Sequence, residues 1–200
     1  QKKVSITHGK KFSDNNELVL WGNYYEADGQ PFAISKEQDF SQKPQSGVAI
    51  LDGIKDRPAY DLGLNYKYED FSLLANIRAN HYISPFSEKG QVYKPDDFRK
   101  LLGLSTGLST PSSHLGLFYN KEIINDLELS FELYNDYNSV IGTVASDSTN
   151  KSGFGLSWNE FSMGGISQLN KKYDLSALGK GSFIFGLQAD TMNLYDSMAP

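Results

Sequence analysis

PAYDLGLNYKYEDFSLLANIRANHYI, residues 58–83, contains two alternating runs of side chains joined by Glu69-Asp70. In the first run every second side chain is apolar or aromatic, and these are Tyr60, Leu62, Leu64, Tyr66 and Tyr68. The second run alternates in the same way, with the apolar positions Phe71, Leu73, Ala75, Ile77 and Ala79. Successive side chains of a strand point to opposite faces, so the stretch predicts a β-hairpin with one apolar and one polar face. Each run has about ten residues, which is the length that a tilted strand needs to cross a bilayer.

The composition of the 200-residue chain favours β structure and excludes several function classes. Twelve Tyr, twelve Phe and eighteen Gly are typical of strands with tight corners. The formal net charge is -5, so no nucleic-acid partner is expected. The absence of cysteine rules out disulfides, thiolate chemistry and zinc–cysteine sites. The mean hydropathy of -0.45 is typical of soluble proteins, but membrane barrels have half-apolar strands and polar loops and reach similar values.

About eight strands follow one another along the chain, with no helical crossovers between them. After the opening hairpin, the clearest alternation lies in a second hairpin, formed by residues 114–121 and 127–137. The remaining strands are expected at residues 3–8, 17–26, 153–172 and 182–195. The alternation of apolar and polar positions changes phase between Trp158 and Phe161, which predicts a β-bulge there. Consecutive strands of this kind form an antiparallel meander.

Short turns alternate strictly with long connections. The short turns are expected at residues 9–16, 69–70, 122–126 and 174–181, and the long connections at residues 28–57, 84–113 and 138–151. All short turns then lie at one end of the sheet and all long loops at the other, as in outer-membrane barrels. We therefore expect residues 1–200 to be an all-β, antiparallel transmembrane β-barrel segment with three long extracellular loops. In the second loop, Lys94-Pro95-Asp96 is expected to start one or two helical turns, onto which Leu101 or Leu102 packs.

The polar face of the strands favours a wet or plugged interior over a packed core. It carries Asp61, Lys67, Asn76, Arg78, Asn80, Glu128, Glu132, Gln188 and Asp190. A small soluble barrel with its apolar face inward could not host these groups unpaired, because burying an unpaired polar group is costly. Aromatic side chains near strand ends predict the girdles of a membrane barrel, and these are Tyr66, Tyr68, Phe71, Tyr82, Tyr119 and Tyr137. The apolar face is therefore expected to contact outer-membrane lipid.

Three segments resemble the early barrel of TonB-dependent outer-membrane receptors in pattern and order. They are ELVLWGNYYEADG (17–29), DGIKDRPAYDLGLNYKYEDFSLLANIRA (52–79) and HLGLFYNKEIINDLELSFELYNDY (114–137). In that family a similar strand, a loop and two similar hairpins follow one another in this order. The resemblance covers most of residues 3–195, and it rests on strand pattern rather than on invariant catalytic residues.

The resemblance implies a barrel of about 22 strands that is closed by a plug domain. Such receptors import a scarce nutrient, such as a ferric siderophore, haem or cobalamin, with energy delivered through TonB. The implied location is the outer membrane of a Gram-negative bacterium, and the implied partners are lipid, the nutrient or metal chelate, and TonB through a plug domain not present in this chain. The chain shows neither plug nor energy-coupling box and closes with YDSMAP, so we expect it to hold only the early barrel strands. No catalysis, cofactor or metal is expected.

Seven residues are the candidate ligand-binding residues of the loops and the lumen. They are Phe32, Phe40, Arg57, Arg78, Phe86, Tyr93 and Phe98. The loop aromatics either stack on a ligand or pack the loops together. Arg78 pairs with an anionic ligand or a plug carboxylate, or alternatively with a carboxylate on a neighbouring strand.

Catalytic and metal-binding roles find less support in the sequence. His114 follows Ser112 and Ser113, but no nucleophile elbow is present and adjacent residues on a strand point apart. His81 is expected to be interfacial rather than a haem or metal ligand. The acidic residues of the loops follow no EF-hand pattern, and these are Asp52, Asp56, Asp96 and Asp97. Two alternatives stay open: a self-contained small outer-membrane barrel that acts as a lipid-modifying enzyme or adhesion scaffold, and a soluble β-protein.

Overall fold

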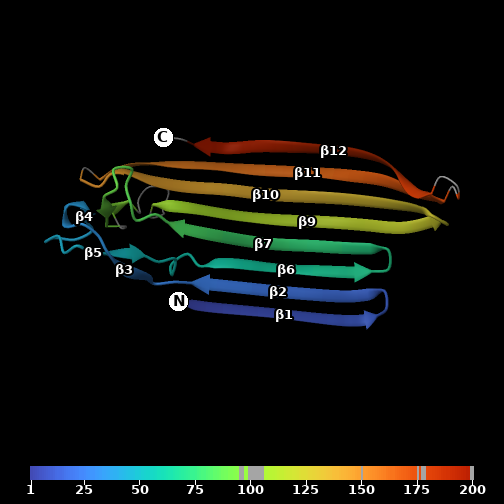
Figure 1. Ribbon diagram of the computed structural model, residues 1–200, viewed down its shortest axis with the longest axis horizontal. Coiled ribbons are helices and arrows are strands. Elements are labelled where there is room, and N and C mark those ends of the chain that lie inside the picture. The colour runs from blue at the N-terminus through green and yellow to red at the C-terminus, as the bar shows by residue number, and fades with distance from the viewer. Residues whose placement is uncertain (95–96, 99–105, 150, 175, 177–178, 199–200) are drawn as a thin grey trace.

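The computed structural model describes residues 1–94, 97–98, 106–149, 151–174, 176 and 179–198. Its main body is an eight-stranded antiparallel sheet (Figure 1). The strands, in their spatial order, are β1 (Lys2–Ser13), β2 (Asn16–Glu26), β6 (Ala59–Tyr68), β7 (Phe71–Ile83), β9 (Gly107–Ile124), β10 (Leu127–Asp147), β11 (Ser152–Asp174) and β12 (Lys180–Met198). The predicted all-β antiparallel meander is therefore confirmed.

The sheet is open. In the described part of the chain, β1 pairs only with β2 and β12 pairs only with β11, so the eight strands do not close into a barrel. Figure 1 shows β1 and β12 at opposite margins of the sheet. Each of these two strands presents one unpaired backbone edge, which is a template for a further strand.

The opening hairpin of the sequence forms β6 and β7 as predicted. Tyr68 pairs with Phe71 next to the turn, and Tyr60 pairs with Ala79 at the far end. Glu69 adopts a positive φ of 52° in the turn. The alternation of the sequence therefore sets both the strands and their register, because a slip by one residue would move every apolar side chain to the other face.

Four short turns lie at one end of the sheet, and the two long connections lie at the other end together with the short connection from β10 to β11. In Figure 1 the turns that join β1 to β2, β6 to β7, β9 to β10 and β11 to β12 are at the right. The connections from β2 to β6, from β7 to β9 and from β10 to β11 are at the left, together with the two labelled ends of the chain. The predicted sorting is confirmed for the first two long connections, but the predicted third long loop is wrong, since only residues 148–151 join β10 to β11. We call the two ends of the sheet the turn end and the loop end.

Three boundaries differ from the sequence-based expectation. β10 continues through Asp147 and β11 begins at Ser152, so residues 138–147 of the predicted third loop are strand. β9 begins at Gly107, which shortens the second loop, and β1 continues to Ser13 through residues predicted as a turn. Residues 139–146 alternate small and apolar side chains on both faces, so the pattern carries no contrast that marks a strand.

The bulge predicted inside β11 is wrong in its position. β11 keeps an unbroken register with β10 through Trp158 and Phe161. The irregularity lies on the other side of β11, where Asn159 pairs with Tyr195 but Ser157 pairs with Met198. The additional residue is therefore in β12, where Asp196 has a positive φ of 50°.

The first two long connections contain short elements that join them to each other. The first holds β3 (Gly29–Ala33), the 3-10 helix η1 (Lys36–Gln38), β4 (Asp39–Phe40) and β5 (Val48–Asp52), and the second holds β8 (Val92–Tyr93). β3 pairs with β5 within the first connection, and β4 pairs in parallel with β8 of the second. Of the predicted helical turns, Asp97 donates its backbone N–H to the Lys94 carbonyl at 3.0 Å. Asp96, Leu101 and Leu102 lie outside the described residues.

The hydrophobic core of the described residues is small and lies at the loop end. Tyr93 and Phe98 pack edge to face, with ring centroids 4.7 Å apart, and they form one buried cluster with Ala145 of β10. The long central parts of the strands have large apolar side chains that stay exposed. The fold is therefore a bare sheet with a packed region of loops at one end.

Candidate functional site

The register of the sheet assigns the side chains to two faces. Leu18, Tyr66, Leu73, Leu117 and Leu133 pair in succession and form one row across five strands. We call the face that carries this row the apolar face and the opposite one the polar face. The register also assigns the faces of β2, in which apolar side chains occupy successive positions: Leu18 and Leu20 lie on the apolar face, and Val19 and Trp21 on the polar one.

The apolar face is uncovered over the middle of the sheet. Leu133 is 59% exposed, Ile77 49% and Leu117 42%. A soluble monomer rarely exposes a contiguous apolar patch larger than a few hundred Å². The apolar side chains in the middle of this face therefore have no cover from the described residues.

A cluster of aromatic rings marks the turn end of the apolar face. Phe71, Tyr119 and Phe131 come from three neighbouring strands, with ring centroids 4.8 Å apart for the first pair and 6.3 Å for the second. Tyr68 pairs with Phe71 and continues the row. Four of the six predicted girdle residues thus belong to this end of the apolar face. Tyr68, Phe71 and Tyr119 lie in the aromatic row, and Tyr66 lies in the next row toward the middle of the sheet. Tyr82 is on the opposite face, where it pairs with Leu108, and this part of the girdle prediction is wrong.

On the polar face, one carboxylate connects three strands. Asp61 Oδ1 accepts a hydrogen bond from Asn76 Nδ2 at 2.6 Å and another from Trp21 Nε1 at 3.1 Å. The Trp21 ring lies directly over Gly63, and a Cβ on that glycine would overlap the ring. Glycine at position 63 therefore lets the indole lie flat across β6 and reach the carboxylate.

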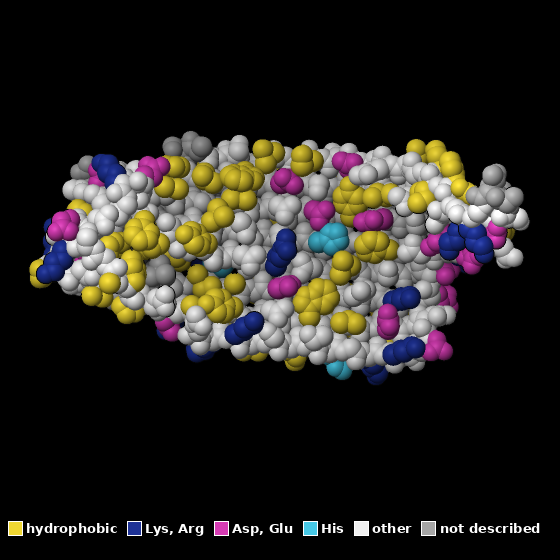
Figure 2. All heavy atoms as spheres, viewed as in Figure 1, with side chains coloured by type: hydrophobic (Ala, Val, Ile, Leu, Met, Phe, Trp, Pro, Cys, Tyr) yellow, Lys and Arg dark blue, Asp and Glu magenta, His cyan; other side chains and the backbone are white. Residues whose placement is uncertain are grey.

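The same row of polar groups continues onto the next strands. Arg78 Nε donates to Ser112 Oγ at 2.9 Å, and His114 Nδ1 lies 2.6 Å from Asp136 Oδ1. Both members of the histidine–aspartate pair are about one third exposed, so this pair is accessible from the polar face. Figure 2 shows acidic, basic and histidine side chains spread among hydrophobic ones over one broad face of the sheet.

Asp39 organises the first long connection. It is 0% exposed, and its carboxylate accepts hydrogen bonds from the backbone and hydroxyl of Ser41, from the backbone and hydroxyl of Ser46, and from the Gly47 N–H. Burial alone would raise the pKa of Asp39, but these hydrogen bonds to the charged form outweigh it and lower the pKa. One buried carboxylate therefore closes the loop from residue 39 to residue 47.

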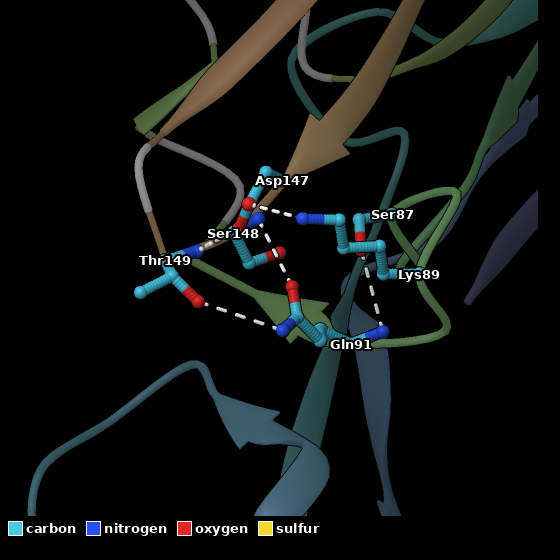
Figure 3. A network of polar contacts seen from close by, with 6 residues as sticks. All are labelled: Ser87, Lys89, Gln91, Asp147, Ser148 and Thr149. Carbon is cyan, nitrogen blue, oxygen red and sulfur yellow. Dashed lines mark hydrogen bonds and ion pairs between the residues drawn. The ribbon is translucent and has the colours of Figure 1, made fainter.

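The second connection is fastened to the turn between β10 and β11 (Figure 3). Lys89 Nζ lies 2.6 Å from Asp147 Oδ2, and Gln91 Oε1 accepts the Ser148 backbone N–H at 3.2 Å. The Glu88 backbone N–H donates to the Ala145 carbonyl at 2.9 Å. Ala145 lies in β10 just beyond Thr143, which pairs with the first residue of β9. The two long connections and the β10–β11 turn are therefore joined, since β4 and β8 link the first connection to the second.

The structure brings two pairs of the seven candidate ligand-binding residues together from different loops. Phe32 of β3 and Phe86 of the second connection have ring centroids 5.9 Å apart. Tyr93 and Phe98 are buried in the loop core, which is the packing alternative for these aromatics. Phe40 is half-buried and pairs with Tyr93 through β4 and β8.

The remaining two candidates lie apart from that group. Arg57 is exposed, and its backbone N–H donates to the Ile54 carbonyl at 3.1 Å. Arg78 is on the polar face as predicted, and its Nε donates to the hydroxyl of Ser112. Sequence reasoning missed the Asp61 cluster, the His114–Asp136 pair and Asp39. The contact of Asp61 with Asn76 could be found by counting the hairpin register from the Glu69-Asp70 turn. The register shift between Leu127 and Glu128 hides the His114–Asp136 pair from such a count.

Within the described ranges, no group of three or more His, Cys, Asp or Glu side chains is placed to hold a metal ion. None of the described residues belongs to a helix with the length and hydrophobicity needed to cross a bilayer. Comparison with known proteins finds no matching family model, no similar curated protein and no similar solved structure.

Proposed function

We propose that this sheet is part of the wall of a transmembrane β-barrel in the outer membrane of a Gram-negative bacterium. We further propose that the barrel belongs to a TonB-dependent receptor that imports a scarce nutrient, such as a ferric siderophore, haem or cobalamin. The observation that carries the proposal is the uncovered apolar face of leucine and aromatic side chains, opposite a face with hydrogen-bonded polar groups.

Lipid is the environment that suits the apolar face. Removing a leucine side chain from water is worth about 1.5–3 kcal/mol, and the face carries a full row of such side chains. Polar groups such as Asp61 and Arg78 would be costly in hydrocarbon, and on the other face they would contact a wet or plugged lumen. β6 has 10 residues, within the roughly 9–11 residues of a tilted membrane-crossing strand, and β7 has 13. β9, β10, β11 and β12 have 18, 21, 23 and 19 residues and would extend beyond the membrane.

The connections and the edges support the same proposal. Short periplasmic turns and long extracellular loops are typical of outer-membrane barrels, and both long connections of this sheet lie at the end opposite the turns that join β1 to β2, β6 to β7, β9 to β10 and β11 to β12. In hydrocarbon, open strand edges are not tolerated, so β1 and β12 would have to pair with further strands. In the proposal these are further strands of the same barrel.

The receptor part of the proposal rests on the resemblance in strand order and on the joined loops. The two long connections and the β10–β11 turn form one packed region, which would present Phe32, Phe86 and Phe40 near the extracellular entrance. The barrel wall would act as scaffold and conduit without catalysis. A plug domain outside this chain would bind the nutrient from the periplasmic side of the barrel. The same domain would transmit the force that TonB exerts.

Epitope insertion in living cells tests the membrane topology. An epitope after Thr149, in the turn between β10 and β11, should bind antibody on intact cells, whereas an epitope between Glu69 and Asp70 should bind only after the cells are permeabilised. Equal accessibility at the two sites, or recovery of the protein in the soluble fraction without detergent, contradicts the proposal.

Uptake measurements test the transport step separately. Deleting the gene should abolish accumulation of one labelled ferric siderophore, haem or cobalamin, and a protonophore should abolish that accumulation in the parent strain. Unchanged accumulation of all three classes after deletion would refute nutrient import and leave the topology intact.

A further inference from the structure

We infer that the turn end of the apolar face binds a zwitterionic glycerophospholipid, with its acyl chains over Leu117 and Leu133 and its headgroup at the Lys121–Asp70 pair. The inference rests on the proposed membrane location, and it adds a ligand site that the transport proposal does not require.

The site is a hollow of about 480 Å³ that spans β7, β9 and β10 at the turn end. Its floor is apolar and is made by Phe71, Leu117, Phe131 and Leu133. The rings of Phe71 and Phe131 lie on the two sides of Tyr119, which also lines the hollow. The hollow therefore offers a smooth apolar trough of the kind that an acyl chain fills.

The rim of the hollow is charged on the side of the turns. Lys121 Nζ lies 3.2 Å from Asp70 Oδ2, and Glu69 also lines the hollow. The Asn120 backbone N–H donates to the Asp70 carbonyl at 2.9 Å, which holds the β6–β7 turn against β9. The side chains of Lys121 and Asp70 are 53% and 39% exposed, so a headgroup can reach both.

The charges of the rim select the headgroup. One ammonium and two carboxylates are present, which leaves the rim with one net negative charge. An ammonium has three N–H donors, so Lys121 can hold Asp70 and a lipid phosphate at once. The amine of a phosphatidylethanolamine headgroup would contact the carboxylates of Glu69 and Asp70. A phosphatidylglycerol headgroup would bring only negative charge to them, which disfavours it.

The position of the rim also fits a lipid that stands along the strands. Lys121 and Asp70 lie beyond the aromatic row, while Leu117 and Leu133 lie on the side of the row toward the middle of the sheet. A lipid in the turn-end leaflet would thus meet polar groups at its headgroup and leucines along its chains. The aromatic rings would lie between them at the level of the glycerol backbone.

Native mass spectrometry of the naturally produced polypeptide tests the inference. The protein is reconstituted in vesicles that contain equal amounts of phosphatidylethanolamine and phosphatidylglycerol. The lipid that stays bound to the protein is then identified by its mass. We expect at least about tenfold preferential retention of phosphatidylethanolamine, and about tenfold weaker retention in Lys121→Met. The matched control Lys67→Met changes a lysine near the same turn but on the polar face, and it should retain the lipid like the parent.

A second variant keeps the test decisive if Lys121→Met does not insert. Asp70→Asn removes one negative charge and should reduce the preference for phosphatidylethanolamine. Equal retention of both lipids by the parent protein, or unchanged preference in the inserted variants, overturns the lipid site. Flotation of the parent with the vesicles is scored in the same preparation. Failure of the parent to float refutes the membrane location, whereas flotation without selective retention refutes only the lipid site.

Discussion

Asn76 of β7 donates its side-chain amide to the carboxylate of Asp61 on β6 at 2.6 Å, in the middle of the polar face. The Trp21 indole N–H reaches the same carboxylate oxygen from β2 at 3.1 Å. One oxygen thus joins three neighbouring strands through side chains, in addition to the backbone ladders. A hydrogen-bonded row of this kind also fixes the register, because a slip would separate the partners.

Removing the carboxylate should destabilise the sheet. In Asp61→Ala, Trp21 and Asn76 lose their shared acceptor, and the free energy of unfolding should fall by about 1–3 kcal/mol. Denaturant unfolding in detergent micelles measures the change. Asn65→Ala on the same strand and face is the control and should change the stability by less than about 0.5 kcal/mol. An equal loss in both variants would mean that the Asp61 cluster contributes no specific stability.

Adding a methyl group at Gly63 should displace Trp21. A Cβ at this position would overlap the indole, so the ring must move away from Asp61 and toward the aqueous side. In a Trp158→Phe background, which leaves Trp21 as the sole indole, the emission of Gly63→Ala should shift to longer wavelength. Gly9→Ala serves as control, since its Cβ would make an ordinary 3.9 Å contact with Val19. No spectral difference between the two variants would show that Trp21 does not depend on Gly63.

The two faces should tolerate charge differently. Leu64→Arg places a guanidinium on the apolar face and should cost about 2–4 kcal/mol of folding free energy in lipid vesicles, since arginine is costly near the middle of a membrane. Asn65→Arg places the same group on the polar face and should be tolerated. Urea titration of folding into vesicles checks both. Similar costs at the two positions would contradict the assignment of the faces.

The loop closed by Asp39 should open in acid. Its folded-state pKa is lowered below the ordinary 3.8, so the stabilisation is fully present above that value and is lost as the pH falls through the lower folded pKa. The protection factors of the Ser46 and Gly47 amides should therefore decrease in that acidic range. Asp39→Asn should show low protection already at neutral pH and no further acid-linked loss. Acid-independent protection in the parent would show that the charge of Asp39 does not hold the loop.

The sequence predicted the strands wherever the two faces differ in polarity. Leu62 and Asp61, or Leu133 and Glu132, contrast strongly, and both hairpins formed as expected. The strand around Ile141 and Val144 was missed because small and apolar residues occupy both faces there. β10 continues past the first residue of β9 and runs alongside the second connection, as shown by the Glu88–Ala145 hydrogen bond. That packing depends on residues distant in sequence, and local alternation does not report it.

The candidate site was less predictable for the same reason. Tyr93 and Phe98 have the composition of ligand-stacking aromatics, but contact with Ala145 of a distant strand buries them. The pairing of His114 with Asp136 does not follow from locating the turn at Asn125-Asp126, because the register shifts by one residue between Leu127 and Glu128. Asp39 had no signal in the sequence, since its donors are backbone groups and two serines of an irregular loop.

Site-directed spin labelling tests the central claim most directly, because the chain contains no cysteine and each label reports on one position. Single cysteines at Leu64, Asn65, Leu133 and Glu132 are labelled in the protein reconstituted in lipid vesicles, and collision rates with oxygen and with a water-soluble nickel chelate are measured. The account predicts high oxygen and low nickel accessibility at Leu64 and Leu133, and the reverse at Asn65 and Glu132. Equal accessibility within each neighbouring pair, or nickel accessibility at Leu64 and Leu133, would contradict the claim that the apolar face contacts lipid.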